Sequence, residues 1–203
     1  MNQVFLLSPA RCDGERARVL LNPSATFALA ERLRSAEGVP LGEVFSFLSG
    51  LYFRGKLAYA GAFGCRPRKE PSTFVITTDR GLVEPAAPVT RGDVLRFATV
   101  DIGAANRAYL DPLERSVETL AESIGARTRV ILLGSIATGK YVDMLVAAFG
   151  KRLLFPSEFV GRGDMSRGGL LLRRVRDGAE LEYEPVLGAV RHGKRPPRLE
   201  RIQ

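Results

Sequence analysis

The 203-residue chain contains no tryptophan, a single histidine and only two cysteines. His192 lies near the C-terminal end, so a Ser–His–Asp triad or a zinc site built from several histidines is not expected. Cys12 and Cys65 are too few for a disulfide framework, and without a Cys-x-x-Cys pair we assign no metal site. The apolar runs are shorter than the roughly 20 residues of a membrane span. The N-terminus lacks the basic region of a signal peptide, and we therefore expect a cytoplasmic protein without a membrane partner.

The charge is unevenly divided between the signs. Lys and Arg number 30 against 22 Asp and Glu, which gives a net charge of +8 and a pI near 10.0. A basic surplus favours polyanionic partners such as nucleic acid. Most of these basic residues are arginines, which GC-rich coding also favours, so the charge leaves both explanations open.

Hydrophobic periodicity predicts strands separated by helices. The strands are expected at 3–7, 73–78, 129–133 and 151–155, and the helices at 25–35, 41–63, 92–98, 104–124 and 138–149. Gly50 and Gly55 can divide the long 41–63 segment into two helices. Asp177-Gly178 lies between two segments that we interpret as strands, 170–176 and 180–185, and predicts a β-hairpin.

This alternation predicts an α/β fold. We expect a mostly parallel central sheet with helices on both faces and a C-terminal β-hairpin at an edge. The predicted organisation is one domain over residues 1–190, followed by a basic, mobile tail over 191–203.

Ligands of open parallel sheets bind beyond the carboxyl ends of the strands. That rule places four loops near one another: 8–16, 78–81, 134–141 and 156–167.

The loop Gly134–Tyr141 fits the phosphate-loop pattern G-x-x-x-x-G-K, with Lys140 as its lysine. Tyr141 stands where a nucleoside triphosphatase needs a small hydroxyl for magnesium, and the strand that follows lacks an aspartate. The pattern therefore favours an anion site over a triphosphatase, with a plain strand–helix turn as the alternative. The phosphate-binding candidates are Arg11, Arg16, Gly134, Ser135, Gly139, Lys140, Arg162 and Arg167.

Three carboxylates follow predicted strands or lie in the glycine-rich loop 161–169. Asp13, Asp79 and Asp164 are the catalytic candidates, as general bases or metal ligands; the alternative is that they pair with neighbouring arginines. No cofactor can be assigned from them. A second basic group comprises candidates for nucleic-acid contact: Arg173, Arg174, Arg176, Arg191, Lys194, Arg195 and Arg198.

Several short segments resemble a known family. Leu7-Ser8-Pro9-Ala10-Arg11 resembles the S-P-A-K/R start of the YaaA-like (peroxide-stress) family. Residues 51–56 (LYFRGK) and 79–85 (DRGLVEP) are similar to segments of a related bacterial domain of unknown function. Gly134–Tyr141 also resembles that group's late G-x-x-Y region. The resemblance implies an α/β fold and, for the YaaA-like proteins, DNA binding linked to oxidative stress.

A second resemblance is to uracil-DNA-glycosylase-like folds. Residues 130–137, followed by Phe155-Pro156-Ser157, resemble the late strand and H-P-S segment of those proteins. Phe155 stands in place of the histidine, and Ser8-Pro9-Ala10 replaces the water-activating motif. The resemblance implies the fold without the usual glycosylase chemistry.

Taken together, the sequence predicts a basic α/β protein that binds nucleic acid, DNA in preference to RNA, or a nucleotide phosphate at the strand-end cleft. One alternative is an enzyme that acts on a nucleotide or nucleobase with the cleft carboxylates. Another is a module whose basic surface meets an acidic protein. The oligomeric state is not indicated.

Overall fold

The computed structural model describes residues 2–67, 70–103, 106–137, 139–194 and 196–197. Its elements, in chain order, are β1 (Gln3–Leu7), α1 (Glu15–Leu21), α2 (Ala28–Arg34), β2 (Val39–Pro40), α3 (Leu41–Ser49), α4 (Leu51–Phe63), β3 (Thr73–Ile76), β4 (Leu82–Val83), β5 (Pro88–Val89), α5 (Arg91–Thr99), α6 (Arg107–Ser123), β6 (Arg129–Leu133), α7 (Gly139–Phe149), the 3₁₀ helix η2 (Gly150–Arg152), β7 (Leu153–Pro156), the 3₁₀ helix η3 (Ser157–Phe159), α8 (Asp164–Asp177) and β8 (Tyr183–Pro185).

A six-stranded sheet in the order β4-β3-β1-β6-β7-β8 lies at the centre. The four inner strands are parallel to one another, and the edge strands β4 and β8 are antiparallel to their neighbours. The predicted α/β fold, with a mostly parallel sheet and an antiparallel C-terminal pair at one edge, is confirmed.

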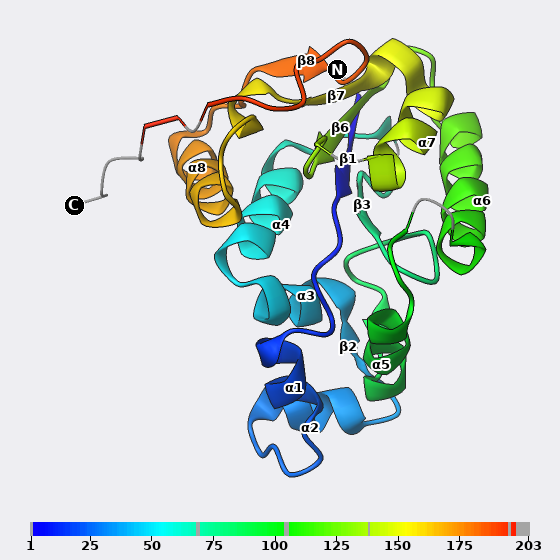
Figure 1. The fold of residues 1–203 in the computed structure, drawn as a ribbon, viewed down its shortest axis with the longest axis vertical. Coiled ribbons are helices and arrows are strands. Elements are labelled where there is room, and N and C mark those ends of the chain that lie inside the picture. The colour runs from blue at the N-terminus through cyan, green and yellow to red at the C-terminus, as the bar shows by residue number, and fades with distance from the viewer. Residues whose placement is uncertain (1, 68–69, 104–105, 138, 195, 198–203) are drawn as a thin grey trace.

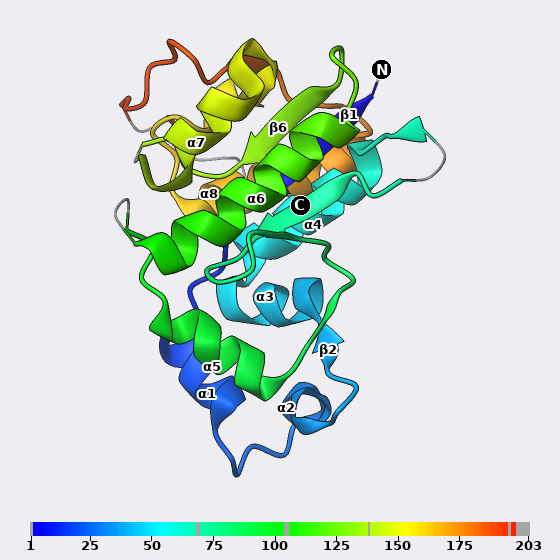
Figure 2. The ribbon, with the colours of Figure 1, turned by 90° about the vertical axis from the view of Figure 1, so that its right-hand side faces the viewer.

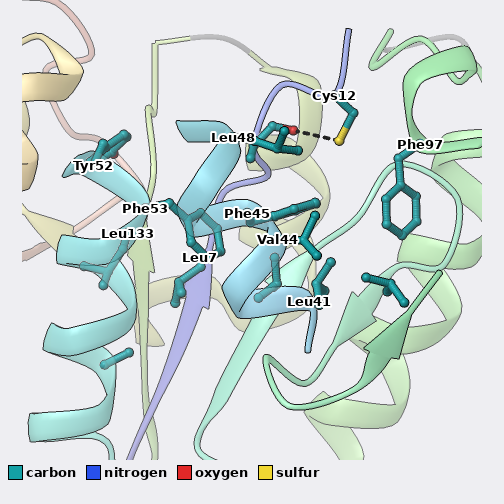
Figure 3. Packing of buried hydrophobic residues seen from close by; sticks show 14 of the residues in the cluster. Leu7, Cys12, Leu41, Val44, Phe45, Leu48, Tyr52, Phe53, Phe97 and Leu133 are labelled. Carbon is teal, nitrogen blue, oxygen red and sulfur yellow. Dashed lines mark hydrogen bonds between the residues drawn. The ribbon is translucent and has the colours of Figure 1, made fainter. Parts of the chain in front are cut away.

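The sheet is covered on both faces because its central strands are apolar on both sides. Phe5 and Leu7 of β1 join the cluster formed with α3, α4 and α8, whereas Val4 and Leu6 join the cluster formed with α6 and α7. Figure 3 shows Leu7 and Leu133 beside Phe53 in the first cluster. In Figures 1 and 2, α4 and α8 lie on one face of the sheet and α6 and α7 on the other.

A smaller lobe lies beyond the carboxyl end of β1 (Figure 1). It contains α1, α2, α3 and α5 and the two-stranded antiparallel pair of β2 and β5. Phe45 of α3 packs edge-on against Phe53 of α4 and Phe97 of α5, which joins the lobe to the helices under the sheet. The carboxyl edge of the sheet therefore faces the lobe.

Helices α4 and α8 cross with their backbones in near contact. A Cβ atom at Gly55 would lie 2.8 Å from the Gly168 carbonyl oxygen, and one at Gly168 would lie 2.7 Å from the Leu51 carbonyl oxygen. Real Cβ atoms do not approach backbone oxygen this closely, so the crossing requires glycine on both helices. It brings the first turns of α8 against the first turns of α4.

The predicted C-terminal hairpin is present as a strand pair but with different residues. Residues 170–176 belong to helix α8, so the assignment of this segment as a strand was wrong. Gly178 ends the helix in the left-handed conformation, with φ of 65°. A left-handed residue is needed both in the hairpin turn that Asp-Gly favours and at a helix C-terminus, so the dipeptide fits either structure. The antiparallel partner of β8 is β7.

Other boundaries also differ from the sequence prediction. Residues 41–63 form two helices, as anticipated, and the break lies at Gly50, where φ is 60°. Helix α1 occupies part of a segment that we had interpreted as a loop, and Asp164 begins a helix inside the predicted glycine-rich loop. No helix within the described ranges is long and apolar enough to cross a bilayer.

We predict that Gly168→Ala lowers the free energy of unfolding by about 1–3 kcal/mol, because the added methyl group must push two helix backbones apart. Gly61→Ala, on the outer side of α4, is the matched control: its Cβ meets no described atom within 4 Å. The control should gain up to about 1 kcal/mol through helix propensity. Urea denaturation measures both variants, and equal effects would show that the crossing is not tight.

Candidate functional site at the carboxyl end of the central strand

A buried lysine lies against the residue that follows β1. Lys56 of α4 is only 1% exposed, and its Nζ donates to the Ser8 carbonyl oxygen at 2.6 Å and lies 3.0 Å from Ser8 Oγ. The Nζ also lies 4.6 and 4.7 Å from the ring centres of Tyr52 and Phe53. Burial lowers the pKa of Lys56 to about 7; Asp164 opposes this shift and Arg167 adds to it.

The loop after β6 approaches Ser8 from a second side. A Cβ at Gly134 would lie 2.8 Å from Ser8 Cβ and 2.8 Å from the Tyr141 hydroxyl oxygen, so only glycine allows this approach. Tyr141, in the first turn of α7, donates its hydroxyl proton to the Ser135 carbonyl oxygen at 3.1 Å. Its pKa is raised to about 12 by burial, against the lowering influence of Ser8 and Arg167.

Helix α8 supplies charge from a third side. The Arg167 side chain is 13% exposed, and its Nε and one terminal nitrogen donate to the Phe159 carbonyl oxygen at 3.2 and 3.0 Å. Its other terminal nitrogen lies 3.6 Å from the Asp164 carboxylate. Arg167 and Asp164 both perturb the pKa values of Lys56, Tyr52 and Tyr141, so the beginning of α8 lies close to all three.

Two tyrosine hydroxyls in this region are buried. Tyr109 has no hydrogen-bond partner within the described ranges, and Tyr52 interacts with Arg167. The pKa of Tyr52 is raised, first by burial; the charge of Arg167 and its hydrogen bond to the hydroxyl oppose the rise, whereas Asp164 and Tyr141 add to it. Burial and Tyr141 likewise raise the pKa of Tyr109, on α6. A buried polar group without a partner costs free energy, so each such group needs an explanation. We call Ser8, Tyr52, Lys56, Tyr141 and Arg167 the Ser8 centre.

The structure brings some of the sequence-predicted residues together at this centre. Gly134 and Ser135 contact Tyr141, Arg167 belongs to the centre, and Asp164 pairs with Arg167. Gly139 begins α7 and packs on Asp143 of the same helix. Lys140 follows Gly139 in the first turn of α7, and its side chain lies outside the described part of the chain.

Two other predicted carboxylates lie in separate ion pairs. Asp13 and Arg11 form an exposed pair at 2.6 Å, with side chains 54% and 80% exposed. The Arg11 hydrogen bond lowers the pKa of Asp13. Asp79 lies 3.7 Å from Arg80 and 3.5 Å from Arg96.

The remaining predicted arginines make contacts within the chain. Arg16 donates to the Phe47 carbonyl oxygen at 3.1 Å, and Arg162 donates to that of Glu158 at 3.0 Å and to Ser166 Oγ at 3.2 Å. Arg174 pairs with Glu158, Arg176 with Asp177 and Arg191 with Asp143. Arg173 lies on α8. The backbone carbonyl of Lys194 lies against Gly161. Arg195 and Arg198 lie outside the described residues.

Cys12 lies in the segment between β1 and α1. Its thiol is 5% exposed and lies 3.5 Å from the Ala10 carbonyl oxygen, as the dashed line in Figure 3 marks. Burial, with Asp13 and Asp79, raises the pKa of Cys12 to about 12. The thiol is therefore protonated at neutral pH.

Two cavities lie near the opposite, amino-terminal edge of the sheet. One, of about 460 Å³, is lined by Arg129, Leu154 and residues 180–184. The other, of about 580 Å³, is lined by Asn2 and residues 125–128. Among the residues that the structure describes, no three His, Cys, Asp or Glu side chains are grouped to hold a metal ion.

Sequence reasoning did not select Lys56, Tyr52 or Tyr141 as functional residues. Tyr141 was interpreted as the residue that departs from the phosphate-loop pattern. The available signal was the spacing of Tyr52 and Lys56, which are four residues apart and so share one helix face, whereas Arg54 lies on the exposed side.

Comparison of the chain with family models, with curated proteins and with solved structures finds no match. The resemblances to the YaaA-like family and to glycosylase-like folds therefore stay predictions.

The low pKa of Lys56 predicts a pH-dependent stability. Between about pH 7 and the ordinary pKa of 10.5, the unfolded chain binds a proton that the folded chain does not. The free energy of unfolding therefore rises with pH in this range because of Lys56, with a slope approaching about 1.4 kcal/mol per pH unit. Lys56→Met removes this contribution. Urea denaturation of both proteins at pH 6, 7.5 and 9 should show their difference changing above pH 7; a constant difference would contradict a buried amine.

Proposed function

We propose that this chain binds a phosphate of a nucleotide or of a nucleic acid at the Ser8 centre. The observation that carries the proposal is the placement of two basic groups, Arg167 and Lys56, around the buried Tyr52 hydroxyl at the carboxyl end of β1. A phosphate oxygen accepts hydrogen bonds and carries negative charge. It can accept from the hydroxyl while it pairs with Arg167, and the Lys56 amine can donate to it in either protonation state.

The position of the centre supports an anionic ligand. Ser8 follows the central parallel strand, and Gly134 follows its neighbour β6, so both lie at the carboxyl edge where open α/β sheets bind ligands. Helix α7 begins at Gly139, and Tyr141 of the centre lies in its first turn. The first peptide N–H groups of a helix carry partial positive charge, which adds to that of the two basic side chains.

A nucleic acid has a path away from the centre along α8. Arg167 is in the first turns of this helix, and Arg173, Arg174 and Arg176 follow in its second half. Nine residues of helix span about 14 Å, which corresponds to about four nucleotide steps along one strand of a duplex. The net charge of +8 favours such a partner over a neutral one.

Binding is measured by fluorescence anisotropy with labelled duplex DNA, single-stranded DNA and structured RNA, each from 50 to 300 mM salt, with mononucleotides as competitors. We expect tighter binding to DNA than to RNA, and an affinity that falls steeply with salt. Equal affinity at both salt concentrations, or no binding at 50 mM, would contradict the proposal.

Tyr52→Phe removes the hydroxyl and keeps the ring that packs on Lys56. The hydroxyl is buried and interacts with Arg167, so its removal should change the free energy of unfolding by no more than about 1 kcal/mol. The same variant should bind ligand about tenfold more weakly, because one hydrogen bond to the phosphate is lost.

Arg32→Ala is the matched control for charge. Arg32 pairs with Glu43 in the small lobe and is 52% exposed, so its loss removes one positive charge far from the centre. Its affinity should equal that of the unchanged protein within about twofold at physiological salt, where the Debye length is about 8 Å. If Arg32→Ala weakens binding as much as Tyr52→Phe, the binding is general electrostatic attraction and the Ser8 centre is not the site.

A further inference from the structure

The Ser8 centre pairs a hydroxyl with an amine in the arrangement that activates a nucleophile. Lys56 Nζ lies 3.0 Å from Ser8 Oγ, and its 2.6 Å hydrogen bond to the Ser8 carbonyl oxygen fixes the amine in place. The lysine is 1% exposed and covered by aromatic rings, whereas Ser8 is only half-buried. The amine is thus shielded from water, whereas Ser8 as a residue is partly exposed.

A lysine of this kind can accept a proton at neutral pH. Burial holds the pKa of Lys56 near 7, so the neutral amine is abundant under physiological conditions. In that form the nitrogen donates one hydrogen to the Ser8 carbonyl oxygen and can accept another from Ser8 Oγ. The charged groups near it are Asp164 and Arg167 of α8, which shift its pKa in opposite directions.

We propose that Ser8 is a nucleophile with Lys56 as its general base, and that the pair cleaves a phosphate ester of the ligand that the Ser8 centre binds. The inference rests on the proposed function for the identity of the ligand. The geometry of the pair is independent of the ligand, and the test below uses that independence.

The reaction has two steps. In the first, Ser8 Oγ attacks phosphorus as its proton passes to Lys56 Nζ; the Oγ–P bond forms, the bond from phosphorus to the leaving oxygen breaks, and that oxygen takes the proton from Lys56. In the second, a water molecule attacks the phosphoserine with Lys56 as base; the Oγ–P bond breaks and the proton returns to Ser8 Oγ. The sum is hydrolysis of one phosphate ester by one water.

The surrounding groups suit the charge that develops on the phosphoryl oxygens. Arg167 supplies positive charge, and the Tyr52 hydroxyl is a donor held in a buried position. Such preorganised donors stabilise a transition state more than the ground state because they need no rearrangement during the reaction. Asp164, 70% exposed and 3.6 Å from Arg167, holds that guanidinium from its solvent side.

A fluorophosphonate tests the nucleophile without a natural substrate. Its reaction with Ser8 forms the Oγ–P bond, breaks the P–F bond and releases hydrogen fluoride. Intact mass spectrometry with peptide mapping should find one adduct, at Ser8, and a rate that rises through about pH 7 to a plateau. Ser8→Ala should abolish the adduct, and Lys56→Met should slow labelling about 100-fold or more. Ser24→Ala, which removes an exposed serine away from the centre, should label like the unchanged protein.

Three results overturn the proposal. They are no labelling of the unchanged protein, equal labelling of Ser8→Ala, and a labelling rate that does not change near pH 7. If Lys56→Met does not fold, the pH profile of the unchanged protein and the Ser8→Ala result decide the question. Anisotropy, measured on the unchanged protein and on Ser8→Ala, reports nucleic-acid binding independently of labelling and so separates the two proposals. Binding without labelling of the unchanged protein refutes only the nucleophile, and labelling of Ser8 without binding refutes only the proposed ligand.

Discussion

The contact between Lys56 and Ser8 is the interaction on which the arrangement of the site depends. A lysine amine enters an apolar interior at a cost in free energy, and it stays there because the strand-end carbonyl and hydroxyl of Ser8 take its hydrogen bonds. The contact joins helix α4 to the end of the most buried strand of the sheet. Helix α8 crosses α4 next to Lys56, at Gly55 and Gly168, so the positions of Asp164 and Arg167 also follow from that helix.

Much of the fold could be predicted from the sequence, for identifiable reasons. After their first residues, Gln3 and Arg129, the strands at 3–7 and 129–133 are entirely apolar. This is the pattern of strands buried on both faces, and the structure places both there. The predicted break in the 41–63 segment lies at Gly50, where the chain takes a positive φ. Asp177-Gly178 was misread because a helix end and a hairpin turn require the same backbone conformation. Only the packing of α8 on α4, a long-range contact, decides between the two.

The position of the candidate site could be predicted better than the residues that form it. The rule for parallel sheets located the loops after β1 and β6, and Gly134, Ser135 and Arg167 lie at or beside the Ser8 centre. Lys56 was missed because a single lysine in a helical pattern is typically solvated, and nothing local shows that its helix is covered on that side. Several arginines that we predict as ligand contacts also make hydrogen bonds or ion pairs within the chain. Arg16 and Arg162 donate to backbone carbonyls, a use of arginine that leaves no trace in sequence spacing.

The glycine crossing of α4 and α8 has a consequence for how such a protein can diversify. With no side chains between the two backbones, their separation cannot be adjusted by small substitutions, since a single methyl group already overlaps a carbonyl oxygen. Lys56, Asp164 and Arg167 are therefore carried on a rigid frame. New ligand preferences can arise far more easily from the segment between β6 and α7, or from the chain that follows Ser8, than from the helices themselves. Directed evolution of this scaffold would keep residues 55 and 168 fixed and randomise the two loops.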